Sequence, residues 1–164
     1  MKQVRVNLSR ESIESARKEL ESYKTEIRGV VNALVAQLVD DGVAIAKAHI
    51  VTMGAVESTE LLAGIEGAFD SVLGIGYVKS SSNHTWFVEF GTGIVGEQNE
   101  GLAPPYITGY VQNASGHDES GWYYYDEKQG RRRWTRGMPP RPFMYKTLLD
   151  LQERARSMTE GMKR

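Results

Sequence analysis

The chain contains no cysteine among its 164 residues. This absence excludes disulfide bonds, thiolate metal sites and cysteine nucleophiles. An excess of one charge is also lacking: the formal net charge is −1, so no global field points to nucleic acid or to an acidic membrane. The start of the chain has no apolar segment of the signal-peptide kind, and no uninterrupted apolar run approaches the ~20 residues of a membrane span. We therefore expect neither.

The composition is that of a globular protein. Hydrophobic residues make up 40% of the chain and charged residues 25%, which is typical of soluble folded proteins and not of disordered ones. A chain of this length can bury a core of its own and fits one domain. The prediction is a single domain over residues 1–164.

The first third of the chain predicts a long helix. Residues 4–8 alternate in polarity and predict a short strand, after which Ser9 suits a helix N-cap. Apolar residues then recur at alternating spacings of three and four, as in a heptad seam: Ile13, Ala16, Leu20, Tyr23, Ile27, Val30 and Leu34. The apolar pattern widens beyond this seam, so the second half of the helix should be the more buried half.

The predicted helix is too long for the domain. From residue 9 to residue 48 it would extend roughly 60 Å, whereas the whole domain should have a radius of gyration of about 15 Å. Either the helix breaks near Asp40 to Gly42, or its first half projects. We favour a break or bend at Gly29 or Gly42, with the amphipathic first half contacting another chain.

The middle of the chain predicts a meander of short antiparallel strands at residues 65–69, 72–78 and 85–90. Gly74 and Gly76 would leave one strand face bare, which often marks the close approach of another backbone. A helical turn is the alternative for the third segment. The carboxylate of Glu89, among bulky apolar neighbours, is either exposed or paired, or it is a binding or subunit-contact residue.

Residues 94–120 are rich in Gly, Asn, Ser and Pro and predict a long loop insertion. Within this insertion, residues 121–136 predict a β-hairpin, with Tyr125 opposite Arg131 and Trp122 opposite Trp134.

The chain closes with a proline-rich approach to a helix. Pro142 suits the first position of that helix, and Asp150 and Arg154 would pair along it. Its apolar stripe would consist of Met144, Leu148, Leu151, Ala155, Met158 and Met162.

No catalytic constellation is evident. The three histidines lie far apart with no metal-binding spacing, and no nucleophile-elbow or phosphate-loop motif occurs. We predict no catalytic, cofactor-binding or metal-binding residue and no enzymatic activity; a hydrolase that uses Glu89 with a histidine is the weakest alternative. Arg131, Arg132 and Arg133, with their aromatic neighbours, could contact nucleic acid or another partner.

Two motifs carry a resemblance to a known family. The run from Phe87 to Gly93, which includes Glu89, Phe90, Gly91 and Thr92, precedes a proline-rich run that ends in Pro142 and Phe143 before a last helix. This pairing resembles the tail-completion or head–tail joining (neck, minor tail) proteins of long-tailed bacteriophages. Ala44, Ala46 and Ala48 fit the family's alanine-rich stretch, but the glycine of its Thr-Gly-x-Leu turn is missing after Thr59.

The patterns and the resemblance together predict an α+β fold: a long N-terminal helix, a small antiparallel sheet and a C-terminal helix packed on that sheet. The resemblance implies a structural virion subunit, made in the host cytoplasm, that forms a homo-oligomeric ring of six in the neck. Its partners would be the tail-tube or tail-terminator protein and the head-side connector, with no membrane, cofactor or small-molecule substrate.

Within that resemblance, Glu89, Phe90, Gly91, Thr92, Gly93, Pro142 and Phe143 would hold the subunit fold or the ring contact. The alternative function is a nucleic-acid-binding or regulatory module that uses the Tyr/Trp/Arg hairpin.

Overall fold

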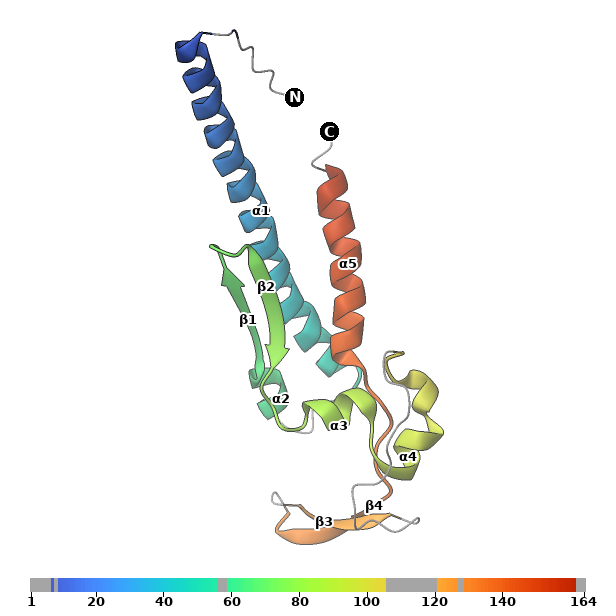
Figure 1. Cartoon of the computed structure of the whole chain (residues 1–164). Helices are drawn as coiled ribbons and strands as arrows, with labels where there is room; N and C mark the ends of the chain where they lie inside the picture. The colour runs from blue at the N-terminus through green and yellow to red at the C-terminus, as the bar shows by residue number, and fades with distance from the viewer. Residues whose placement is uncertain (1–6, 8, 56–58, 106–120, 127–128, 162–164) are drawn as a thin grey trace.

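A computed structural model describes residues 7, 9–55, 59–105, 121–126 and 129–161 (Figure 1). The predicted strand at residues 4–8 lies almost wholly outside these ranges. The elements in chain order are α1 (Arg10–Thr52), α2 (Thr59–Ala63), β1 (Ile65–Asp70), β2 (Ile75–Ser80), α3 (Thr85–Phe90), α4 (Gly93–Gln98), the 3-10 helix η1 (Glu100–Leu102), β3 (Trp122–Asp126), β4 (Arg131–Thr135) and α5 (Phe143–Gly161).

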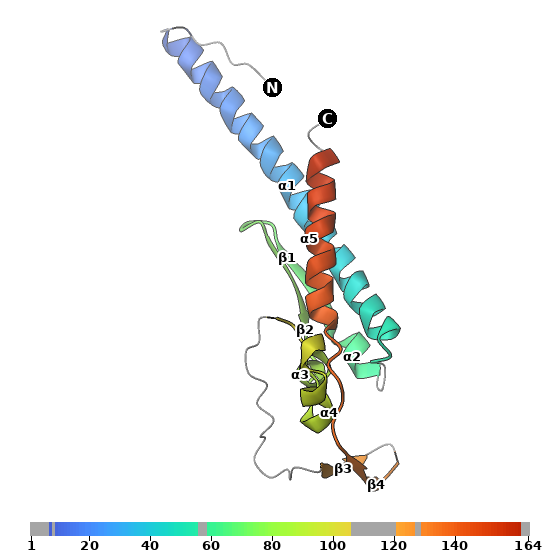
Figure 2. The same cartoon turned by 90° about the vertical axis from the view of Figure 1, so that its right-hand side faces the viewer.

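Helix α1 is continuous over 43 residues. It begins as predicted, because the Ser9 hydroxyl accepts a hydrogen bond from the Ser12 N–H at 3.2 Å. The favoured break at Gly29 or Gly42 is wrong, and the alternative of a projecting first half is correct (Figures 1 and 2). A single glycine costs a helix only about 1 kcal/mol relative to alanine, which is too little to end it among good helix formers.

The second half of α1 is the more buried half, as predicted, and β1 and β2 pack against it as an antiparallel hairpin. Glycine permits this close approach. A Cβ at Gly76 would lie 2.4 Å from Val39 Cγ2, and one at Gly67 would lie 2.5 Å from Val39 Cγ1. The sequence identified Gly76 correctly and missed Gly67. Gly74 was assigned wrongly, since it lies in the turn before β2 with a φ of +68°.

The third segment of the predicted meander is the helix α3, not a strand, so the sheet has two strands. The helical alternative is correct here. A strand would send Val88 and Glu89 to opposite faces, whereas the helix buries both neighbours on one side. The rings of Trp86 and Phe90 then stack one turn apart, with centroids separated by 5.5 Å.

The predicted hairpin forms as β3 and β4, but its register differs by one residue. Tyr123 pairs with Trp134 and Tyr125 with Arg132, because Asp126 still belongs to the strand and pairs with Arg131. The strand β3 therefore extends one residue further than expected, to Asp126. The insertion before the hairpin is also not all loop, since α4 and η1 occupy its first part, and residues 106–120 lie outside the described ranges.

Helix α5 packs against α1 and the strands, which confirms the predicted α+β fold. It begins at Phe143, one residue after Pro142. The Asp150–Arg154 pair does not form as predicted. Asp150 Oδ2 instead lies 2.8 Å from His49 Nε2, and Arg154 pairs with Asp41. Both side chains thus join α5 to α1, because their side of α5 faces that helix.

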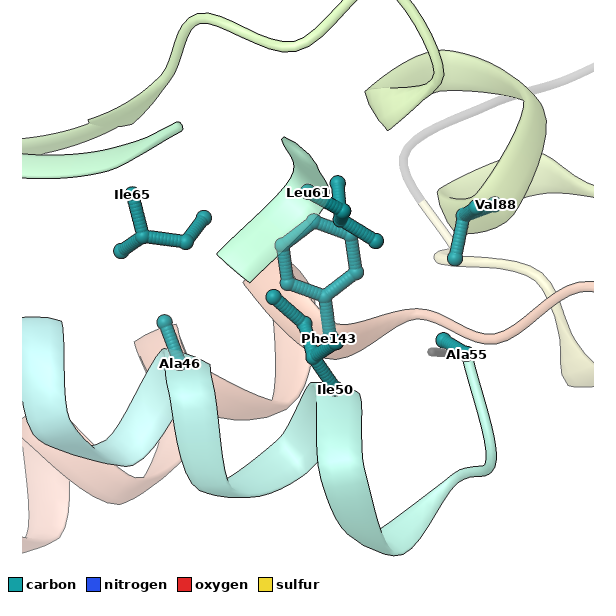
Figure 3. Packing of buried hydrophobic residues seen from close by; sticks show 7 residues of the cluster. All are labelled: Ala46, Ile50, Ala55, Leu61, Ile65, Val88 and Phe143. Atoms are coloured by element: carbon teal, nitrogen blue, oxygen red, sulfur yellow. The ribbon is translucent and has the colours of Figure 1, made fainter. Parts of the chain in front are cut away.

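The predicted apolar stripe of α5 is only partly covered. Met144, Leu151, Ala155 and Met158 are half-buried, and Leu148 is exposed. Met162 lies outside the described residues. The core of the molecule lies where the start of α5 meets the end of α1 (Figure 3). Its buried members come from α1, the segment after it, α2, β1, α3 and α5: Ala46, Ile50, Ala55, Leu61, Ile65, Val88 and Phe143.

By length and composition alone, α1 could cross a membrane. An 18-residue stretch of α1 has a mean hydropathy of 1.4, and 17% of that stretch is buried in the fold. Asp40 and Asp41 interrupt the apolar part of the helix, and Asp41 is engaged by Arg154. Core helices can pass the same test, so this finding is weak evidence for a membrane span.

Candidate functional site

The two motifs that carry the family resemblance lie side by side in the fold. Thr92 and Met138 form an antiparallel bridge, with the Thr92 N–H donating to Met138 O at 2.9 Å and the Met138 N–H donating to Thr92 O at 3.1 Å. The Arg141 N–H donates to Val88 O at 2.7 Å. Segments some fifty residues apart thus form one unit, which we call the motif junction (residues 88–93 and 137–143).

Glycine is required on both sides of the motif junction. Gly91 has a φ of +73°, and a Cβ there would lie 2.7 Å from both Met138 O and Pro140 N. Gly137 has a φ of +99°, and its Cβ would lie 1.8 Å from Thr92 O. These positions favour glycine for both conformation and space. The Gly-Thr-Gly run is therefore a packed crossing of two backbones and not an exposed turn.

Glu89 is buried at the start of α5, with 3% of its surface exposed. Its two carboxylate oxygens each accept one backbone hydrogen bond at 2.9 Å, from the N–H groups of Met144 and Tyr145. The first turn of a helix has unpaired N–H groups and a partial positive charge, which a carboxylate satisfies. Glu89 is thus a helix cap supplied from another element, so the expectation of an exposed carboxylate or of one paired with a cation is wrong.

The environment of Glu89 also shifts its protonation. Burial raises the pKa of the Glu89 carboxyl above its ordinary value, and the backbone N–H donors of α5 lower the pKa by a smaller amount. The carboxyl is enclosed by the fold, so it is not placed to meet a substrate.

Pro142 and Phe143 are the part of the motif junction that is packed into the core. Both are buried, and Phe143 has 0% of its surface exposed (Figure 3). Its ring lies beside Leu61 and Ile50 in the centre of the core. Of the two roles suggested for the motif residues, Glu89, Gly91, Pro142 and Phe143 therefore fit that of holding the subunit fold.

Two exposed aromatic residues beside the motif junction were not predicted from the sequence as contact residues. Trp86 is 68% exposed and Phe87 53% exposed, both on α3, while Phe90, Thr92 and Gly93 are half-buried. Large aromatic side chains that remain open are frequent in protein interfaces. Their signal was present in the sequence, but interpreting the segment as a strand assigned Trp86 and Phe87 to opposite faces.

The arginines of β4 do not act as one cluster. Arg131 Nε donates to Gln129 Oε1 at 3.0 Å, and Arg133 Nη1 lies 3.2 Å from Asp126 Oδ2. Arg132 lies on the other face of the hairpin. The register places Tyr123, Tyr125 and Trp134 on that same face, all exposed.

The first half of α1 carries a row of exposed apolar side chains. The side chains of the heptad seam are between 42% and 57% exposed at Ile13, Leu20, Tyr23, Ile27 and Val30. Ala16 is buried and Leu34 half-buried. Most of the seam therefore lacks the cover that the apolar face of an amphipathic helix requires.

Nothing in the described residues favours catalysis. No group of three or more His, Asp or Glu among them is placed to hold a metal ion. Ser82, Glu60 and His84 lie together, with Glu60 contacting the Ser82 hydroxyl at 3.3 Å and His84 Nε2 at 3.7 Å. The carboxylate is the central member, whereas nucleophilic catalysis needs the imidazole beside the hydroxyl.

The chain was also compared with known proteins. No protein-family model, no curated protein and no solved structure matches it.

Proposed function

We propose that this chain is a structural subunit of a tailed-phage virion, acting in the neck as a tail-completion or head–tail joining protein. It would assemble with copies of itself into a ring and contact the tail-tube or tail-terminator protein on one side and the head-side connector on the other. The assignment to phage necks rests on the resemblance of the motif segments. The fact that those segments pack together as the motif junction supports a shared structural role.

The exposed apolar surface carries the assembly part of the proposal. The seam of α1, the Trp86–Phe87 pair and the tip of the β1–β2 hairpin at Val72 and Leu73 all contribute apolar side chains. Such surface usually marks contacts with other chains.

Two measurements test the proposal. Light scattering of the purified chain should give a mass that is a multiple of 18.3 kDa. In a lysate of the phage that encodes the chain, with its gene inactivated, electron microscopy should find filled heads beside unattached tails. Intact infectious particles in that lysate would rule out the neck role.

A nucleic-acid-binding role is the second candidate. Its supporting observation is the hairpin face on which Tyr123, Tyr125 and Trp134 are exposed beside Arg132, since aromatic rings and a cation suit stacking on bases. Labelled single-stranded DNA should then bind with an affinity that falls steeply with salt, because phosphate contacts release counterions. Arg132→Ala should reduce that salt dependence, and unchanged binding would reject this candidate.

A further inference from the structure

The heptad seam of α1 and the core face of α1 lie on different sides of the same helix. The seam ends at Leu34, because the next two seam positions are Gln37 and Asp41. The core face begins at Val35 and continues through Val39, which contacts the β1–β2 hairpin. At 3.6 residues per turn the two faces are separated by roughly a third of a turn. The seam is therefore a second apolar surface and not an extension of the core.

The flanks of the seam carry opposite charges. If Ile13, Leu20 and Ile27 are placed at heptad position a, the e positions hold Arg17, Lys24 and Val31, with Arg10 at the e position before them. Arg10 and Arg17 also pair with Glu14 and Glu21 on the same helix. The g positions of the same heptads hold Glu19, Glu26 and Ala33. One edge of the seam is thus basic and the other acidic.

This charge pattern discriminates between orientations of two copies. In a parallel pair, position g of one helix meets position e of the next heptad on its partner, which sets Glu19 against the partner's Lys24. In an antiparallel pair, e meets e and g meets g. Arginine and lysine would then face each other along one edge, and Glu19 and Glu26 along the other, so this orientation is disfavoured.

We propose that the heptad seam from Ile13 to Leu34 binds the same seam on a second copy of this chain, in parallel and in register, with the acidic edge of one helix on the basic edge of the next. The inference rests on the proposed self-assembly and adds which surface makes the contact and in which direction.

The seam is short enough that it needs help from the rest of the subunit. From Ile13 to Leu34 it spans about 32 Å, or three heptads, and most of the stability of such a helix in a protein comes from packing of its apolar face and not from the helix itself. The full chain is therefore the right test object.

Orientation can be tested by cross-linking, because the natural chain has no cysteine. The variants I13C and L34C place one thiol at each end of the seam. A short thiol-to-thiol reagent cannot bridge the ~32 Å between these ends. Cross-linking of each variant with itself, and not between the two variants in a mixture, is the expected result. Cross-linking only between I13C and L34C would overturn the proposal.

Charge reversal tests the edges independently. K24E should weaken self-association about tenfold in a parallel pair, since it replaces an attraction by a repulsion at each contact. E19K/K24E should restore the affinity of the natural chain. In an antiparallel pair position 24 faces a basic e position of the partner, so K24E would leave the affinity unchanged or raise it, and either result would overturn the proposal.

A seam variant and a matched control separate this inference from the proposed function. L20E should dissociate the assembly, whereas L102E alters a leucine in η1 with the same exposed fraction, 57%, outside the seam and should leave it intact. An oligomer that survives both L20E and K24E would overturn the seam inference and leave the proposed ring standing. A monomer at every concentration would overturn both, and so would a monomer that binds anionic lipid vesicles through the seam.

Discussion

At the scale of single residues, the motif junction depends on groups that close contacts between distant segments. Glu89 is the clearest case. A carboxylate from α3 fills the open N–H groups at the start of α5, so one side chain fixes where the C-terminal helix begins relative to the rest of the core. Its burial makes the arrangement sensitive to pH.

Glu89→Gln should remove part of this pH sensitivity. The pKa of Glu89 is raised in the folded state, so its contribution to stability is fully present below the ordinary glutamic acid pKa of about 4.3 and is lost as the pH rises through the raised value. Glutamine has no such titration. The unfolding free energy of the natural chain, relative to that of E89Q, should therefore fall as the pH rises, as measured by urea unfolding at several pH values. A constant difference would contradict this expectation.

Gly137→Ala should destabilise the motif junction. The added Cβ would collide with the Thr92 carbonyl oxygen, and the φ of +99° disfavours any side chain, so we expect a loss of about 3 kcal/mol or more. Gly29→Ala is the matched control. A Cβ at Gly29 meets nothing within 4 Å, and alanine favours the helix by about 1 kcal/mol. Thermal melts at equal protein concentration should move in opposite directions for the two variants.

At the scale of elements, close packing of the β1–β2 hairpin on α1 depends on small residues facing branched ones. Gly67 and Gly76 leave room for the side chain of Val39, whereas larger residues at these two positions would hold the hairpin away from the helix. The contact is a fit of shapes, and a change on one side should be relieved by a change on the other.

Gly76→Ala should therefore cost about 1–3 kcal/mol through overpacking against Val39. Adding Val39→Ala removes the nearest methyl group, which lies at 2.4 Å, so the two costs should be less than additive by about 1 kcal/mol. Urea unfolding of both single variants and the double variant gives the coupling. Simple additivity would show that the hairpin does not pack on Val39 in this way.

Ion pairs between α1 and α5 act at the same scale. Asp41 with Arg154 and His49 with Asp150 bridge the two helices along one side. Arg154 and Asp150 are each about half-exposed, and pairs this open typically contribute less than about 1 kcal/mol. They help to orient α5 against α1, whereas Phe143 and its apolar neighbours supply most of the attachment.

At the scale of the whole molecule, stability should depend on protein concentration. A small core and a large exposed apolar surface are typical of subunits whose folding is completed by assembly. The melting temperature of the natural chain should rise with concentration. That of L20E should not, because its seam carries a charge. Equal behaviour of the two proteins in calorimetry across a hundredfold concentration range would contradict this expectation.

The sequence by itself determined much of the local structure. Alternating spacings of three and four predicted α1, Ser9 predicted its start, and clusters of turn residues between β-prone runs predicted both hairpins. These features depend on neighbours within a few residues, so they can be deduced from the chain without knowledge of its partners in space. The α+β class followed from the order of those elements.

Only the tertiary structure decided which faces meet. Whether α1 bends, which strand glycines admit Val39, and what Glu89 caps depend on residues 30 to 60 positions away, and no local pattern encodes them. Residues 85–90 show the reason most clearly: their aromatic run suits a strand, but burying Val88 and Glu89 on one side, beneath α5, requires a helix. Packing between distant segments overrides the local preference for helix or strand wherever the contact contributes more to the free energy of folding than the propensity does.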